Sequence, residues 1–299
     1  MKKNFLIYIS VFLASVFFVG CDKYEGEGTQ LPAPIENNQS NTDLVELLES
    51  TNWVTTEVAP GIVWKYYHFT NLLGSRQYVT LFDIDLNDPD IKIEIPYVTS
   101  GFLKTSAAAE QKDADVAFNG SYFNTSTGGS TVYFKTGGNV INQTRSGFNP
   151  YRENGAFTLS STGKAEIVQK PSGGWGVVGA ANVLAGGPLL IVNGEKVLQQ
   201  NVEFNINRHP RTVMGLTGDN HLLAVVVDGR SRESQGLSTI DLSELMFALG
   251  CVSAVNMDGG GSSTAWVKGE GVVNHPTDNG KFDHEGERGV ATVFTVKAQ

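Results

Sequence analysis

A strand–helix–strand unit near the carboxyl end constrains the fold of this 299-residue chain more than any other feature. Residues 222–227 form a short, apolar and largely β-branched run that is typical of a buried strand. Residues 238–249 place leucine and methionine at helical spacing after a serine N-cap, and Gly250 can end that helix. Residues 254–257 predict a second buried strand. A crossover of this kind makes the two strands run parallel, as neighbours or with one strand between them.

An aspartate follows each of these two strands. Asp228 comes directly after the first strand, and Asp258 comes directly after the second. Because parallel strands end at the same edge of a sheet, we expect both carboxyls at the edge where such sheets usually bind ligands. Adjacent strands would separate the two backbones by about 5 Å, and one intervening strand would separate them by about 10 Å. Either spacing is compatible with two carboxylates that act on one substrate.

Basic residues are expected beside these aspartates. Residues 211–216 predict another strand, and residues 218–220 (Gly-Asp-Asn) predict the turn that leads to the strand at 222–227. A hairpin closed at that turn pairs Arg211 with the neighbourhood of Asp228, and it brings along two further basic residues, Arg208 and His209. A structural ion pair between arginine and aspartate remains open as the alternative interpretation.

Three glycines, residues 259–261, follow Asp258, and three hydroxyl residues, 262–264, come next. Glycine lets backbone N–H groups approach a ligand closely, so this loop can hold an anion beside Asp258. A simple tight turn is the alternative. The lysine of a nucleotide P-loop is missing. The sequence places no base beside Ser262 or Ser263, which favours hydrogen bonding to an anion over a nucleophilic role.

Several segments together resemble the phosphodiester glycosidase family, and they occur in the family's order over about residues 75–299. The resemblance implies a hydrolase that separates a sugar from a phosphate carried by another sugar or by a polyol. The chain departs from the usual pattern at Ser121, Tyr122 and Met257. The matching segments are residues 119–123, 186–190, 209–212 and 227–230, the helix that ends at residues 250–251, and residues 256–264 and 287–288.

With this resemblance, we expect Asp258, Asp228 and Arg211 to be the catalytic residues. The sequence does not decide which aspartate is nucleophile or base, or whether configuration is retained. Arg211, with His209 or Arg230, would bind the phosphate and stabilise its charge as it leaves. The expected substrate-binding residues are Asn119, His209, Arg230, Gly187, Gly259, Gly260, Gly261, Ser262 and Ser263.

No cofactor or metal is expected, and the five histidines show no zinc-type pair. A hard cation held by Asp228, Asp258 and nearby oxygens remains open as an alternative. Two alternative functions remain open. The first is a non-catalytic lipoprotein that binds a carbohydrate or phosphoglycan, and the second is a phosphodiesterase that cuts the P–O bond. The expected partner is a phosphoglycan or small sugar phosphate. The net charge of −9 argues against nucleic acid, and the sequence does not indicate an oligomeric state.

The amino terminus predicts export and anchoring. Two lysines precede an apolar run, and together residues 1–20 read as a signal peptide. Residues 19–21 resemble a bacterial lipoprotein box, which predicts lipidation of Cys21, a flexible tether over residues 21–41, and membrane attachment at the bacterial cell envelope. The protein would then face the periplasm or lie on the cell surface. A secreted protein cleaved elsewhere is the alternative.

The rest of the chain predicts an α+β fold with a large mixed β-sheet core and few helices. An N-terminal extension, residues 42–74, is expected to pack on a glycosidase-like domain at 75–299. Cys251 is expected to be a buried core residue without a disulfide partner. The other expected elements are helices at 42–50 and 105–112, strands at 78–86, 91–95 and 290–296, and long loops near the site at 124–155.

Overall fold

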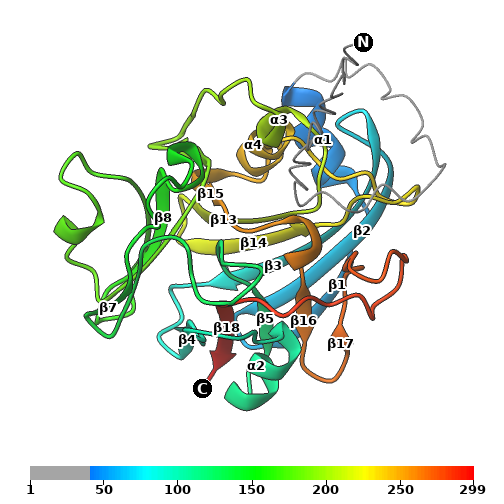
Figure 1. Ribbon diagram of the computed structural model, residues 1–299. Coiled ribbons are helices and arrows are strands. Elements are labelled where there is room, and N and C mark those ends of the chain that lie inside the picture. The colour runs from blue at the N-terminus through cyan, green and yellow to red at the C-terminus, as the bar shows by residue number, and fades with distance from the viewer. Residues whose placement is uncertain (1–40) are drawn as a thin grey trace, which may run out of the picture. The chain divides into compact units, whose positions relative to one another are not determined.

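The computed structural model describes residues 41–299, and the strands of this part of the chain form three antiparallel sheets (Figure 1). The described residues belong to one compact unit. The largest sheet has eight strands in the order β1-β2-β3-β14-β13-β15-β11-β12. Their bounds are β1 Val54–Ala59, β2 Ile62–Leu72, β3 Ser75–Asp85, β11 Leu189–Val192, β12 Glu195–Lys196, β13 Arg211–Thr217, β14 His221–Val227 and β15 Cys251–Asn256.

Two five-stranded sheets complete the β structure. One has the order β7-β6-β10-β8-β9, and the other has the order β17-β16-β5-β18-β4. The strands of the first are β6 Phe134–Thr136, β7 Asn139–Asn142, β8 Gly155–Leu159, β9 Ala165–Gln169 and β10 Asn182–Gly186. Those of the second are β4 Ile91–Glu94, β5 Val116–Asn119, β16 Ala265–Val267, β17 Gly271–Val272 and β18 Val293–Ala298.

Two helices, α1 (Asn41–Ser50) and α4 (Thr239–Ala248), cover one face of the large sheet. They lie above that sheet in Figure 1, and the sheet that contains β5 and β18 lies below it. Helix α2 (Thr105–Lys112) packs its alanines against β5 and β18. The remaining helical segments are short: α3 Glu203–Ile206, and the 3-10 turns at Pro150–Arg152, Trp175–Val177 and Gly260–Ser262.

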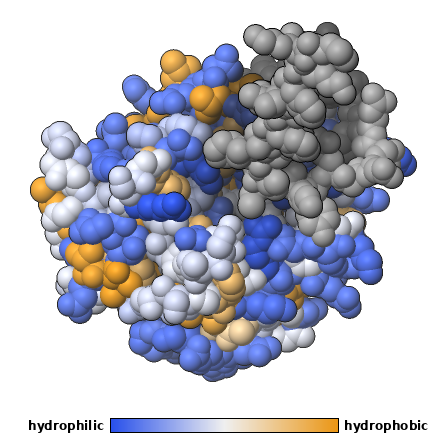
Figure 2. Space-filling view, viewed as in Figure 1, coloured by the Kyte–Doolittle hydropathy of each residue, from blue (hydrophilic) through white to orange (hydrophobic). Residues whose placement is uncertain are grey.

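Strand periodicity explains this layering. On β3, Phe82 and Ile84 face the smaller sheets, whereas Val79 and Leu81 face α1 and α4. Both faces of the large sheet are therefore buried, which is why its central strands read as continuous apolar runs. The face shown in Figure 2 is mostly hydrophilic, with apolar side chains in small groups.

The α+β class is confirmed, although the described strands form three sheets whose neighbours are all antiparallel, in place of one mixed sheet. The predicted crossover is present, because β14 and β15 both pair antiparallel with β13 and therefore run parallel to each other. Ser238 caps α4 by accepting a hydrogen bond from the Asp241 N–H at 3.0 Å. The helices at α1 and α2 were also predicted, and Cys251 is buried in the core.

The domain boundary expected at residue 75 cuts through a hairpin. Strands β2 and β3 pair along their length, with Leu72 opposite Ser75, so residues 54–72 belong to the large sheet. The extension is therefore an integral part of the sheet, because β1 and β2 supply two of its strands. The predicted signal peptide, the lipidation site Cys21 and nearly all of the tether lie outside the described residues. None of the helices found within residues 41–299 is long and apolar enough to cross a membrane.

Candidate active site

The predicted sheet edge brings the two aspartates and Arg211 together at the level of the backbone. Asp228 follows β14 and Asp258 lies two residues beyond the end of β15, while β13 runs between these strands. Arg211, the first residue of β13, lies opposite Val227, as the predicted hairpin requires. The side chains, however, have very different surroundings.

Asp228 is only 1% exposed, and its carboxylate is fully engaged by the protein. One oxygen accepts a hydrogen bond from the Asn274 amide at 2.8 Å. The other accepts from the backbone N–H of His275 at 2.9 Å and lies 2.7 Å from Nδ1 of the same residue. Its oxygens are therefore committed to ordering residues 274 and 275.

His275 is the main side chain that Asp228 positions. An ionised carboxylate only accepts hydrogen bonds, so it favours a proton on Nδ1 and leaves Nε2 as the second functional nitrogen. The imidazole stacks on Phe282 at a centroid distance of 3.6 Å and meets the edge of Tyr78 at 4.5 Å. Burial, together with the nearby Asp228 charge, raises the pKa of the Tyr78 phenol. His275 was not predicted from the sequence, because it has no spacing pattern with Asp228.

Arg211 is also buried, with 1% of its surface exposed, and its guanidinium binds backbone oxygens. Nε donates to Leu237 O at 2.9 Å, and Nη2 donates to Phe204 O at 2.7 Å and to Asn207 O at 3.1 Å. Burial lowers its pKa to about 10. Arg211 therefore ties together the segments around α3 and residue 237. Of the three residues expected to line one pocket, Asp228 and Arg211 have side chains that are committed to protein partners, and Asp258 does not share this feature.

Asp258 differs from Asp228 because it is half-buried and its carboxyl has few protein donors. The Gly259 N–H donates to it at 3.0 Å. Burial raises the pKa of Asp258, while Arg152, the nearby Ser262 hydroxyl and Arg288 act in the opposite direction. A carboxyl that is held in a desolvated, cationic setting is typical of functional sites.

The backbone of Asp258 is fixed by Asn119, which is fully buried on β5. The Asn119 amide donates to Asp258 O at 2.8 Å, and its oxygen accepts from Thr212 Oγ1 at 2.7 Å and from Thr264 N at 3.1 Å. Asn119 was expected to touch the substrate. Its amide instead joins β5, β13 and the loop after β15, so it positions Asp258.

Arg152 was not identified from sequence, although the loops at 124–155 were expected near the site. Its guanidinium carbon lies 4.3 Å from the Tyr122 ring centroid and 4.5 Å from that of Phe204. The next residue, Glu153, is buried and accepts hydrogen bonds from Thr144 at 2.7 Å and Trp175 at 2.9 Å, which fixes the loop. The buried Nε of Arg152 has no hydrogen-bond partner among residues 41–299.

The glycines after Asp258 make room for two further arginines. A side chain built on Gly260 would place its first carbon 3.1 Å from Nη2 of Arg230, and one on Gly261 would lie 2.4 Å from Nη2 of Arg288. Arg288 also makes a two-point ion pair with Asp278, at 2.7 and 2.6 Å. Three arginines, Arg152, Arg230 and Arg288, therefore surround the Asp258 loop.

The amides of this loop are largely used within the protein. The N–H groups of Gly260, Ser262 and Ser263 donate to Pro210 O, Gly259 O and Gly260 O at 2.9–3.2 Å. The Gly259 N–H is held by the Asp258 side chain. Four of the five amides in residues 259–263 are thus already satisfied, so the expected anion-binding nest is not formed by this loop in the way the glycines suggested.

Three further expected substrate contacts also serve the scaffold. Gly187 O accepts hydrogen bonds from Tyr122 Oη at 2.5 Å and from Asn256 Nδ2 at 2.9 Å. Ser263 is 1% exposed and receives a bond from Thr212 at 3.3 Å. His209 pairs through its backbone with Leu237. Within the described part of the chain, no group of three or more histidine, cysteine, aspartate or glutamate residues could hold a metal ion.

These features define a sheet-edge site in which one half-buried carboxyl is surrounded by arginines. A family model described as phosphodiester glycosidase matches residues 112–297. The chain belongs to the phosphodiester glycosidase family.

Curated relatives add little about activity. The chain is 36% identical over 98 residues to YomE, an uncharacterised protein derived from the SPbeta prophage of Bacillus subtilis strain 168. The matched region covers 32% of this chain but only 15% of that relative.

Solved structures share the fold. The zebrafish N-acetylglucosamine-1-phosphodiester alpha-N-acetylglucosaminidase catalytic domain, auto-inhibited by its pro-peptide, matches with a TM-score of 0.64 at 18% identity, over 81% of this chain and 85% of that one. A hypothetical protein from Synechocystis matches with a TM-score of 0.61 at 16% identity, over 84% of this chain and 64% of that one. At these identities the similarity concerns the fold alone.

Proposed function

We propose that this protein is a hydrolase that releases a sugar from a phosphodiester linking it to another sugar or to a polyol. The observation that carries the proposal is the half-buried Asp258 carboxyl beside Arg152 and Arg288 in a member of the phosphodiester glycosidase family. Cleavage of the bond between a sugar and a phosphate requires a carboxylate that acts at the sugar and cations that bind the phosphate.

The arginines bind and stabilise the phosphate. A guanidinium presents its donors in a planar fork that matches two phosphate oxygens. When the bond between the anomeric carbon and the bridging oxygen breaks, the electron pair stays on the phosphate, and nearby cations stabilise the added charge. Phosphate is already a good leaving group, so a strong general acid matters less here than in ordinary glycosidases.

Asp258 acts at the sugar. Its carboxylate stabilises the positive charge that develops at the anomeric carbon, either as the nucleophile or as the base that takes a proton from the attacking water. In both cases water supplies the new hydroxyl of the free sugar, and the phosphate leaves as a monoester. Asn119 keeps Asp258 in place through its backbone oxygen.

Asp228 is a positioning residue in this mechanism. It acts through His275 and Asn274, and the Asn274 amide also donates to Ser263 O at 3.0 Å on the loop after Asp258. We therefore assign Asp228 to the support of the site, and Arg211 to the same role through its three backbone contacts.

Hydrolysis of an N-acetylglucosamine-1-phospho-sugar diester in ¹⁸O-water tests the proposal, with and without a divalent cation. Cleavage at the anomeric carbon gives free sugar that carries the label. Labelled phosphate would instead indicate a phosphodiesterase, and tight binding without any product would indicate a non-catalytic binding protein. Either of the last two results contradicts the proposed reaction.

The proposed location is the bacterial cell envelope, with a lipid on Cys21. Support comes from the sequence of residues 1–21 alone, in which an apolar run ends at a cysteine. Metabolic labelling with a fatty acid, followed by fractionation, is expected to place wild-type protein in the membrane and Cys21→Ser protein in the soluble fraction. Unlabelled wild-type protein in the soluble fraction would exclude the anchor.

A further inference from the structure

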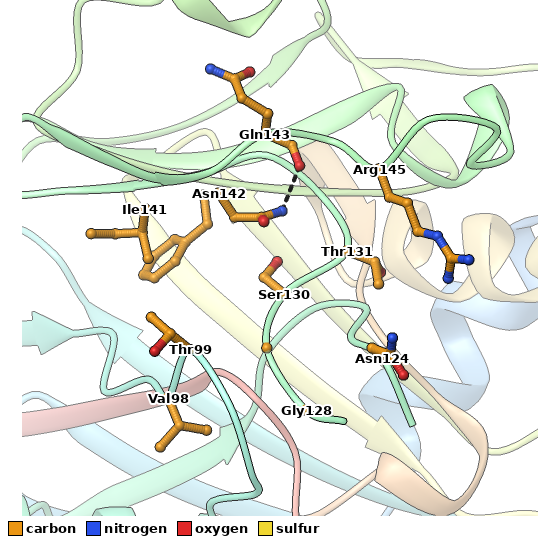
Figure 3. A pocket seen from close by; sticks show the side chains of 12 residues that line it. Val98, Thr99, Asn124, Gly128, Ser130, Thr131, Ile141, Asn142, Gln143 and Arg145 are labelled. Carbon is orange, nitrogen blue, oxygen red and sulfur yellow. Dashed lines mark hydrogen bonds between the residues drawn. The ribbon is translucent and has the colours of Figure 1, made fainter. Parts of the chain in front are cut away.

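A cavity of about 390 Å³ with a mixed polar and apolar lining lies among the loops that follow β4, β5 and β7. Figure 3 shows its walls, which come from residues 98–99, 124, 128–131, 134, 141–143 and 145. None of its lining residues belongs to the candidate active site described above. Its volume falls within the range of small-molecule sites, and one pyranose ring with its substituents fits such a space.

Close backbone packing builds one wall of this cavity. A side chain on Gly128 would lie 1.8 Å from Gly101 O, and one on Gly129 would lie 2.5 Å from Thr99 O. Both glycines have φ near +75°, a conformation that other residues rarely adopt. The two loops are therefore locked together, and the wall exists before any ligand binds.

The lining combines an apolar surface with unsatisfied polar groups. Val98, Phe134 and Ile141 supply the apolar part. Thr131 Oγ1 is buried and has no hydrogen-bond partner among the residues that the structure describes. Asn142 uses its amide nitrogen on Val132 O and Gln143 O, which leaves its oxygen as an acceptor. An apolar face with nearby donors and acceptors suits a sugar ring.

A cation stands beside these groups. Arg145 is exposed, and Figure 3 shows its side chain on the same side of the cavity as Thr131 and Asn124. Its backbone N–H donates to Thr131 O at 2.9 Å, which fixes its position. No ion pair joins Arg145 to a carboxylate within residues 41–299, so its charge is available to an anionic ligand.

The cavity walls continue into the active site along the chain. The Thr131 N–H donates to Tyr122 O at 3.0 Å, and Tyr122 carries Arg152 on its ring. On the other wall, the Phe148 N–H donates to Arg145 O at 3.1 Å, and the Phe148 ring also contacts Arg152. A ligand in the cavity would therefore lie next to the segments that hold the phosphate-binding arginine.

We infer that this cavity binds a single sugar unit that carries one anionic group, within the glycan attached to the scissile phosphodiester. The inference rests on the proposed function, since it extends the substrate beyond the bond that is cut. Arg145 binds the anionic group, Thr131 and Asn142 bind hydroxyls, and the apolar residues contact the ring. The substrate is then an acidic glycan that contains at least one sugar unit in addition to the two groups joined by the phosphodiester.

Binding of glucose 6-phosphate, glucuronate and glucose to the full chain tests this inference by calorimetry. Arg145→Ala is expected to weaken the two anionic probes at least about 10-fold and to leave glucose unchanged, because only the charge is removed. Thr131→Val is expected to weaken all three probes several-fold. Tighter binding of glucose 6-phosphate would indicate a phosphorylated sugar as the ligand, and tighter binding of glucuronate would indicate a uronic acid. Arg232→Ala, which removes an exposed arginine elsewhere, is the control.

Two results would overturn the inference. One is wild-type affinity for every probe in both cavity variants. The other is loss of binding in Arg152→Ala but not in Arg145→Ala, which would put the probe in the active site. Failure of the proposed function is distinguishable, because it leaves probe binding sensitive to Arg145 while the diester is not hydrolysed.

Discussion

Asp228 and Asp258 occupy equivalent places in the chain but have different environments. Each follows an apolar strand, each precedes a glycine, and both lie at the same edge of the large sheet. Asp228 is 1% exposed and its two oxygens accept hydrogen bonds from Asn274 and His275. Asp258 is half-buried, and only Gly259 donates a backbone bond to its carboxyl.

The difference shows how the surroundings decide the role of a carboxyl. A carboxylate whose lone pairs are all used by the protein orders its neighbours and has little left for a substrate. A carboxyl whose desolvation is incompletely offset keeps a raised pKa and reacts readily with a ligand that completes its environment. The difference therefore supports the proposed roles, in which Asp258 takes part in the chemistry and Asp228 supports the site.

Asp258→Asn carries the largest expected effect. Removing the carboxylate that is proposed to react should lower kcat for the phosphodiester substrate by about 10³-fold, while the protein stays folded. Steady-state kinetics and circular dichroism measure the two properties. Asp219→Asn changes an exposed aspartate on the β13–β14 turn and serves as the matched control. Wild-type turnover in folded Asp258→Asn would remove Asp258 from the mechanism.

Arg152→Ala should have the next largest effect, about 10²-fold on kcat/KM, because one cation is lost from the leaving phosphate. Arg152→Lys should recover only part of this activity, since lysine lacks the planar fork that stacks on Tyr122 and Phe204. Arg232→Ala is expected to behave as wild type. If Arg152→Ala and Arg232→Ala lose the same factor in kcat/KM, only the overall charge of the protein matters and the role of Arg152 is contradicted.

Asp228→Ala should act mainly on stability. It leaves the buried donors of Asn274 and His275 without partners, which should lower the free energy of unfolding by roughly 2–4 kcal/mol. Urea unfolding followed by fluorescence measures the change. His275→Gln keeps the Asp228 carboxylate and should cost less stability. A stable Asp228→Ala protein without activity would return Asp228 to the reacting groups.

The smallest expected effect concerns pH. Burial raises the pKa of Asp258 in the folded protein above the value of about 3.9 in an unfolded chain. The folded state thus holds a proton that the unfolded state has released, so this group lowers the free energy of unfolding as pH rises through that window. Asp258→Asn has no titrating group at this position and so does not show this decrease. Its free energy of unfolding relative to that of wild type should therefore increase from pH 4 to pH 7. A constant difference in urea midpoints would contradict the assignment.

Local patterns in the sequence predict the framework of the site. The apolar runs and the Gly-Asp-Asn turn predict the β13–β14 hairpin, and the helix cap at Ser238 predicts the crossover to β15. These features depend on residues close in sequence. The positions of Asp228 and Asp258 at one sheet edge follow from them.

The partners of those residues come from distant segments and could not be predicted in this way. His275 lies 47 residues beyond Asp228, and Arg152 comes from a loop more than a hundred residues before Asp258. The glycines at 259–261 indicate that another group lies close to the backbone of this loop, but they do not identify that group. Arg230 and Arg288 approach Gly260 and Gly261, where an anion was expected.

Chemical rescue by formate tests most directly whether the carboxylate at position 258 is the reacting group. Asp258→Ala leaves a space beside Arg152 into which a small carboxylate can diffuse. Hydrolysis of the diester by Asp258→Ala should be restored in proportion to formate concentration, and formate should not change the activity of Asp228→Ala. Rescue of Asp228→Ala alone, or full activity of Asp258→Ala without formate, would contradict the account.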